Sequence, residues 1–212
     1  GANAAAVRHG DDAWEVLQFG NAELVGERTY ELSRLLRGQL GTEHAMADPL
    51  PVGADFVLLD QNVVAVASGF EALERAVELR VIATSRDHGD PSAVTLEMTP
   101  QATALKPLSP VHLRARRDGS GVTFGWTRRS RFEADSWVGE VSLGEEREAY
   151  ALDILDGSDV VRTIEVSSPS VLYMTADEIA DFGALQTSLT VRVAQLSATV
   201  GRGFAAVAIL TP

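Results

Sequence analysis

The chain has 212 residues, of which 45% are hydrophobic and 23% charged, with no cysteine and a formal net charge of −12. This composition is typical of a folded globular chain, and the length allows one large domain or two small ones. The lack of cysteine excludes a disulfide scaffold, a thiolate zinc site and a cysteine nucleophile.

Neither a membrane nor a nucleic acid is an expected partner. No stretch of the chain approaches the roughly 18 uninterrupted apolar residues of a transmembrane helix, and the first nine residues lack the pattern of a signal peptide. Residues up to Leu105 carry 7 arginines against 16 acidic residues, and the remainder carries 11 basic residues against 14 acidic ones. Because this excess of negative charge repels phosphate, we expect no direct contact with nucleic acid.

Hydrophobic residues of the first half come in short bursts between glycines and polar residues, a pattern that favours strands over helices. The pattern predicts, in chain order, short strands within 14–36, a loop over 38–53, a hairpin of 56–59 with 63–67, one helical turn over 71–75, a strand over 79–84, a turn over 86–91 and a strand over 94–98.

A domain boundary is expected near residues 100–108, where Pro100, Pro107 and Pro110 interrupt the chain and the charge balance changes. We therefore predict a small β-rich domain over 1–105 and a second domain over 106–212.

The second domain opens with a clear hairpin pattern. Val111, Leu113 and Ala115 alternate with polar residues, a glycine-rich turn follows, and Phe124 and Trp126 alternate on the return strand. We expect the apolar side chains of both strands to face the core.

Further strands are predicted over 138–143, 150–155, 160–166, 189–193 and 204–210. One short helix is predicted after Pro169, with Thr175 as N-cap, Glu178 as its capping-box partner and Gly183 at the C-terminal end. About seven strands at this spacing indicate a β-sandwich, so the predicted fold class is mainly β with one short helix.

No motif of the sequence predicts a catalytic residue or a cofactor. The four histidines are too far apart in sequence to suggest a metal site, and no Gly-x-Ser-x-Gly nucleophile motif is present. Asp153, Asp156 and Asp159 are consistent with either a calcium loop or an ordinary acidic turn. The acidic loop over 145–148 is either a solvated loop or, in a hydrolase, a source of acid–base carboxylates.

The candidate protein-binding residues are arginines and one tryptophan. The alternation predicts four arginines on the outer face of the first hairpin: Arg114, Arg116, Arg129 and Arg131. There they either bind an acidic neighbour or keep the sheet from aggregating. Trp137, near a polar loop, is added as a protein-binding residue or a platform for a sugar ring.

Two segments of the second half carry a family resemblance. LKPLSPVHLRARRDGSGVTFGWTRRSR, from Leu105, resembles the opening of a fibronectin type III-like domain in phage tail-tip proteins, and LTVRVAQLSATVGRGFAAVAIL, from Leu189, is similar to its last two strands. In the first half, TYELSRLLRGQLGTE, from Thr29, resembles a strand and loop of siphophage host-specificity proteins. Taken together, the chain resembles the C-terminal portion of the baseplate hub proteins of gene transfer agents.

The resemblance implies a fibronectin type III-like β-sandwich in a structural protein of a phage-like particle. It implies a non-enzymatic tail-tip component, made in the bacterial cytoplasm, that holds tail fibres and contacts the host during DNA delivery. Other baseplate and tail-fibre proteins would be its partners, and the parent protein would be homo-oligomeric in the particle. The alternative is a carbohydrate-binding module that recognises a cell-surface glycan.

Overall fold

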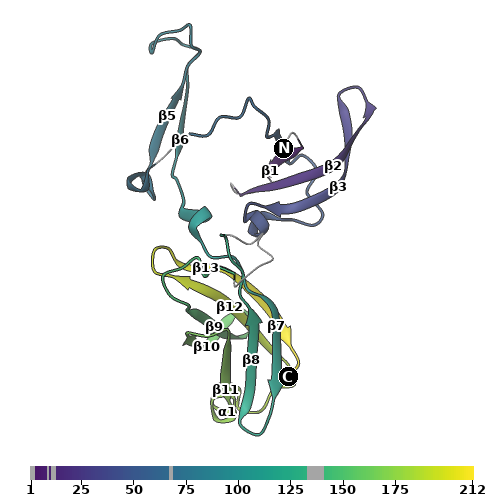
Figure 1. Ribbon diagram of the computed structural model, residues 1–212, viewed down its shortest axis with the longest axis vertical. Helices are drawn as coiled ribbons and strands as arrows, with labels where there is room; N and C mark the ends of the chain where they lie inside the picture. Colours follow the sequence, from purple (N-terminus) through teal and green to yellow (C-terminus); the bar gives the residue numbers. More distant parts are fainter. Residues whose placement is uncertain (1–2, 9, 11–12, 67–68, 133–140) are drawn as a thin grey trace. The chain divides into compact units, whose positions relative to one another are not determined.

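The chain forms two compact, mainly β units, Gly1–Gln101 and Ala102–Pro212 (Figure 1). The computed structural model describes residues 3–8, 10, 13–66, 69–132 and 141–212. In this part of the chain it shows 13 strands, all paired antiparallel, one α-helix and three 3-10 helices. The predicted fold class, mainly β with a sandwich and one short helix, is confirmed.

A four-stranded antiparallel sheet with the order β3-β2-β1-β4 forms the body of the first unit. Its central strand β1 is rich in alanine and was not predicted. Ala5 and Val7 of β1 are buried with Leu17 of β2 in a small core. The strands are β1 (Ala4–Arg8), β2 (Trp14–Gly26), β3 (Thr29–Gln39) and β4 (Asp55–Leu58), with a 3-10 helix η1 (Thr42–Ala45) between β3 and β4.

The predicted hairpin of 56–59 with 63–67 is wrong. Strand β4 pairs with β1, and residues 63–66 form no strand. The Asp60 carboxylate accepts a hydrogen bond from the Asn62 backbone N–H at 2.8 Å, and the Val63 N–H donates to the Asp60 carbonyl. These bonds make a local turn that ends the strand, because an aspartate side chain competes for backbone donors.

The first unit also contains a two-stranded hairpin of β5 (Val77–Val81) and β6 (Val94–Met98), preceded by the 3-10 helix η2 (Phe70–Ala72) (Figure 1). Its register sets Val77 opposite Met98, Leu79 opposite Leu96 and Val81 opposite Val94. Side chains that face each other across a ladder share one side of it, so these six residues form a continuous apolar face.

The second unit is a sandwich of two antiparallel sheets, with the orders β11-β8-β7 and β10-β9-β12-β13. Its core contains Phe124, Trp126, Tyr150, Leu152 and Val193, each 2% exposed or less. A 3-10 helix η3 (Ala102–Leu105) precedes the strands, which are β7 (Val111–Arg117), β8 (Gly121–Thr127), β9 (Tyr150–Asp156), β10 (Asp159–Val166), β11 (Ser170–Met174), β12 (Leu189–Ser197) and β13 (Gly201–Leu210).

The strand predicted over 138–143 is not found where the structure can test it. Residues 133–140 lie outside the described part, and residues 141–143 form no strand. The carbonyls of Val141 and Ser142 instead accept hydrogen bonds from the Arg128 guanidinium at 2.9 and 2.7 Å. The remaining strand of the three-stranded sheet is β11, which was not predicted.

Helix α1 (Thr175–Phe182) begins one residue earlier than predicted: the N-cap is Met174 instead of Thr175, and it forms no side-chain capping bond. Glu178, the expected capping partner, is fully buried and forms a two-bond ion pair with Arg117 of β7 at 2.7 and 2.9 Å. The helix ends as expected at Gly183, whose φ of 75° is in the left-handed region that glycine tolerates.

Candidate protein-binding surface

Arg114 and Arg116 lie exposed on the outer face of the β11-β8-β7 sheet, as the alternation predicts. Arg114 lies against Gly125 of the neighbouring strand: a Cβ built on this glycine would come within 3.2 Å of the Arg114 Cζ atom. The missing side chain therefore gives the guanidinium room to lie along the sheet, where it presents a flat donor surface.

These two arginines differ from most other arginines of the second unit. Arg117, Arg131, Arg162, Arg192 and Arg202 each form an ion pair with an aspartate or glutamate. Within the residues that the structure describes, Arg114 and Arg116 form no ion pair or hydrogen bond through their side chains. Their donors therefore remain available to an external acceptor.

The other predicted members of this surface are placed differently. Strand β8 ends at Thr127, so Arg129 and Arg131 lie beyond the hairpin, which corrects the prediction that they share its outer face. The Arg131 guanidinium donates to the Glu145 carboxylate at 2.5 Å and to the Ala104 carbonyl at 3.1 Å. Arg129 is half-buried, and Trp137 lies outside the described residues.

A cluster of arginines around a buried aspartate, not predicted from the sequence, lies on the four-stranded sheet of the second unit. Asp153 of β9 is 1% exposed and accepts hydrogen bonds from Arg192 Nε at 2.9 Å, from both terminal nitrogens of Arg202 at 2.6 and 3.0 Å, and from Thr163 Oγ1 at 2.7 Å. Burial works to raise the pKa of Asp153, but the bonds from Arg202, Thr163 and Arg192 outweigh it and lower the pKa to about 2. The cluster thus ties together four strands.

The calcium interpretation of the acidic turn does not fit this geometry. The Asp153 carboxylate is bonded to two arginines, so it is not available as a calcium ligand beside Asp156 and Asp159 at the β9–β10 turn. No group of three or more histidine, aspartate or glutamate side chains suited to a metal ion is found within the described ranges.

Glutamates of the acidic loop also have structural partners. Glu145 pairs with Arg131, and Glu148 accepts a hydrogen bond from the Tyr150 hydroxyl at 2.8 Å. Glu148 and Glu165 line an open depression of about 480 Å³ together with Arg147. The bonds of Glu145 and Glu148 therefore hold the acidic loop against the sandwich.

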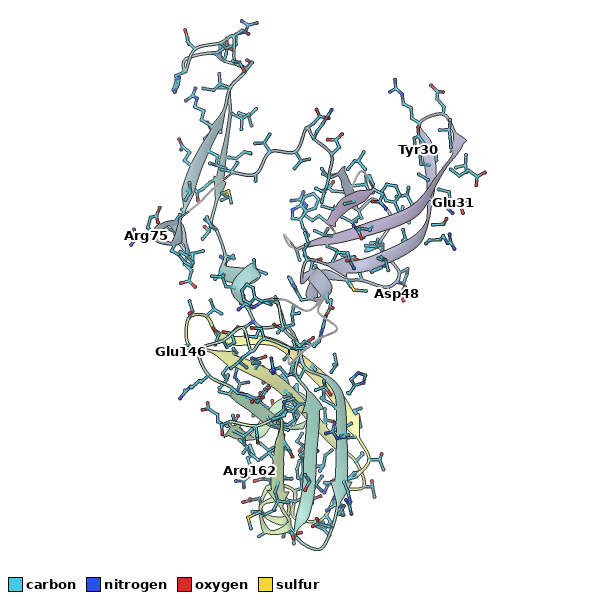
Figure 2. All side chains as sticks on the ribbon, viewed as in Figure 1. Tyr30, Glu31, Asp48, Arg75, Glu146 and Arg162 are labelled. Carbon is cyan, nitrogen blue, oxygen red and sulfur yellow. The ribbon has the colours of Figure 1, made fainter. Side chains whose placement is uncertain are left out.

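The first unit carries an apolar groove of about 470 Å³ on its sheet, which we call the β2–β4 groove. Tyr30, one of its lining residues, is labelled on the β2–β3 ribbon in Figure 2. Several of its side chains are well exposed: Tyr30 by 61%, Phe56 by 50% and Leu58 by 41%. The full lining is Phe19, Ala22, Arg28, Tyr30, Leu32, Phe56 and Leu58.

None of the helices in the described part of the chain has the length and apolar character needed to span a bilayer.

Comparison with known proteins gives one family match. A family model described as Rcc01698-like, C-terminal matches residues 1–57, a segment that contains β1, β2, β3 and η1 and most of β4. No curated protein matches the chain.

Among solved structures, domains d3–d4 of the extracellular region of rat CD45 align with 91% of this chain and 94% of their own, at 8% sequence identity and a TM-score of 0.36. The assignment of the second unit as a sandwich rests on its own strand order.

Proposed function

We propose that this chain is a non-enzymatic component of the baseplate or tail tip of a phage-like particle of the gene transfer agent type. In this role it provides a platform for tail-fibre attachment and host-cell contact during DNA delivery. The particle, rather than the cytoplasm where the protein is made, is its proposed place of action. The observation that carries the platform role is the outward pair Arg114 and Arg116 on an open sheet face.

The family evidence supports the particle assignment. The model that matches residues 1–57 has a name related to gene transfer agents, and the strand and loop from Thr29 resemble siphophage host-specificity proteins. These two observations concern the same part of the chain. The resemblance of the segment from Leu105 to phage tail-tip proteins supports the same assignment for the second unit.

The surface evidence supports a protein partner. Arginine is enriched among the residues that dominate protein interfaces, because its planar guanidinium can donate several hydrogen bonds while its stem packs against apolar groups. Arg114 and Arg116 share this outer face with Leu172 and Met174 of β11, which lie across the intervening strand β8 and are 42% and 53% exposed. A partner with carboxylates beside apolar side chains would match this face.

The test is capture of tail-fibre proteins by the purified chain, with Arg114→Glu and Arg116→Glu as a double variant. Arg147→Glu is the matched control, because Arg147 is also exposed and its side chain forms no hydrogen bond or ion pair with the described residues. We expect the parent chain and the control to capture a fibre protein, and the double variant to lose at least about tenfold in affinity, equivalent to 1.4 kcal/mol.

Equal capture by the double variant would remove the arginine face from the interface. No capture by the parent chain at any salt concentration, together with binding to a glycan array, would overturn the fibre-platform proposal in favour of direct carbohydrate recognition.

A further inference from the structure

The β5–β6 hairpin presents an apolar face that is largely exposed within the described residues. We call it the apolar hairpin face; it consists of Val77, Leu79, Val81, Val94, Leu96 and Met98. Val81 is 58% exposed, Val94 53%, Leu96 52% and Met98 44%. Val77 and Leu79 are half-buried, so these four residues form the exposed part of the face. Four apolar side chains at this exposure on one face are unusual on a surface that stays in water.

The opposite face of the same hairpin is polar. Glu78 pairs with Glu97 and Arg80 with Thr95. The hairpin is therefore amphipathic, with two facing glutamates whose like charges weaken the pairing. Because a lone two-stranded hairpin is at best marginally stable in water, a surface that covers the apolar side would stabilise it.

The first unit also contains a receptor of matching chemistry. The β2–β4 groove is lined by aromatic and aliphatic side chains, and its volume of about 470 Å³ is that of a site able to hold several of them. Its one charged lining residue is Arg28, a cation. The rest of the groove lining is apolar, as are all six residues of the apolar hairpin face.

We infer that the apolar hairpin face of one copy of this chain docks in the β2–β4 groove of a second copy. Both halves of the contact are present on every copy, so each copy donates one hairpin and accepts another. Such a head-to-tail contact forms closed rings when its rotation closes. The inference is independent of the arginine face proposed above for fibre attachment, since the two use different units.

Surface area favours the groove over a second hairpin as the occupant. Six side chains of this kind bury on the order of 300–400 Å² per copy, short of the roughly 800 Å² per partner of a stable interface. Direct pairing of two hairpins would bury that face once and leave both grooves open. Exchange between hairpin and groove covers both apolar surfaces of every copy.

Because the chain contains no cysteine, disulfide trapping can test the contact without a background reaction. Leu96→Cys on the apolar hairpin face is mixed with a differently tagged Leu58→Cys chain, whose cysteine lies in the groove. The control mixture replaces Leu96→Cys with Thr95→Cys, one residue away on the polar face. We expect the first mixture to form at least about tenfold more mixed disulfide dimer, the ratio given by 1.4 kcal/mol of preference.

Three results would overturn the inference. The first is equal trapping by the Leu96 and Thr95 cysteines. The second is a Leu96→Cys chain that links mainly to itself, which would indicate hairpin-to-hairpin pairing. The third is a chain with both Leu58→Cys and Leu96→Cys that closes its disulfide only internally, which would make the hairpin an occupant of its own groove.

A second measurement avoids cysteine altogether. Sedimentation velocity over a range of concentrations should show self-association of the parent chain and of Thr95→Asp, and weaker association of Leu96→Asp by about tenfold or more. A parent chain that stays monomeric at all concentrations, with no mixed disulfide in the trapping experiment, refutes the contact.

Discussion

Replacement of Asp153 by asparagine should destabilise the second unit by about 2 kcal/mol. The pKa of Asp153 is lowered from 3.8 to about 2 in the folded chain, and a shift of this size corresponds to roughly 2 kcal/mol of preferential stabilisation of the ionised form. Removing one partner of a fully buried ion pair costs about 3–5 kcal/mol. We expect about 2 kcal/mol, below this range, because the side chains of Arg192 and Arg202 are 37% and 43% exposed and can be solvated once the carboxylate is gone.

The assay is urea unfolding followed by tryptophan fluorescence, in a Trp14→Phe background so that the signal comes from the second unit. Asp156→Asn is the matched control, since Asp156 ends the same strand but is exposed. We expect the Asp153→Asn variant to unfold at lower urea and the control to unfold with the parent chain. Equal stability of all three proteins at pH 7 would refute the assigned role of the cluster.

The pH dependence gives a second check on the same residue. Because the folded-state pKa of Asp153 is lowered, its contribution is complete above the unfolded-state pKa of 3.8 and is lost as the pH falls toward about 2. The difference in stability between the parent chain and Asp153→Asn should therefore shrink between pH 4 and pH 2. A difference that stays constant across this range would contradict the pKa assignment.

Two further substitutions test how the sandwich is closed. Gly121→Ala should destabilise the second unit by about 3 kcal/mol or more, because Gly121 has a φ of 152° and an added Cβ would lie 2.1 Å from the Tyr173 carbonyl oxygen. Gly119→Ala is the control, since no atom lies within 4 Å of the added Cβ. Thermal unfolding should give a lower melting temperature for Gly121→Ala than for Gly119→Ala, and equal values would contradict the packing of β8 against β11. Tyr173→Phe should lower the free energy of unfolding by about 1–2 kcal/mol, because it removes the 2.7 Å hydrogen bond from the hydroxyl to Asp181 while the ring stays in the core. Urea unfolding measures this difference, and a variant as stable as the parent chain would show that the hydrogen bond does not stabilise the fold.

The second unit was the more predictable part of the fold because its strands alternate. The inward side chains of β8 and β9 follow a period of two, so Phe124, Trp126 and Leu152 could be assigned to the core before the partner strands were known. Strand β11 was missed because it lies between Pro169 and the helix signal at Thr175. The apparent capping box there was misleading, since burial of Glu178 against Arg117 outweighs the local preference.

The first unit was harder to predict because its pairing is non-local. Strand β1 has the sequence AAAVR, and alanine has low β propensity. The strand is held by backbone pairing with β2 on one edge and β4 on the other. Sequence spacing suggested that β4 would pair with the next apolar run, but its partner lies some 50 residues earlier in the chain.

The candidate surface was predicted in part. Arg114 and Arg116 follow from alternation along a single strand, which the sequence records. The placement of Arg131 depends on where β8 ends, and the Asp153 cluster depends on the register of four strands. Neither quantity can be obtained from spacing along one strand.

The Asp153 cluster also restricts the order in which the second unit can be completed on the ribosome. Its acceptor emerges 39 residues before Arg192 and 49 residues before Arg202. A nascent chain that stops before β13 holds a buried carboxylate with only part of its counter-charge, so the four-stranded sheet gains its full stability when the last strand is released. The sandwich should therefore complete its folding only after β13 has emerged from the ribosome.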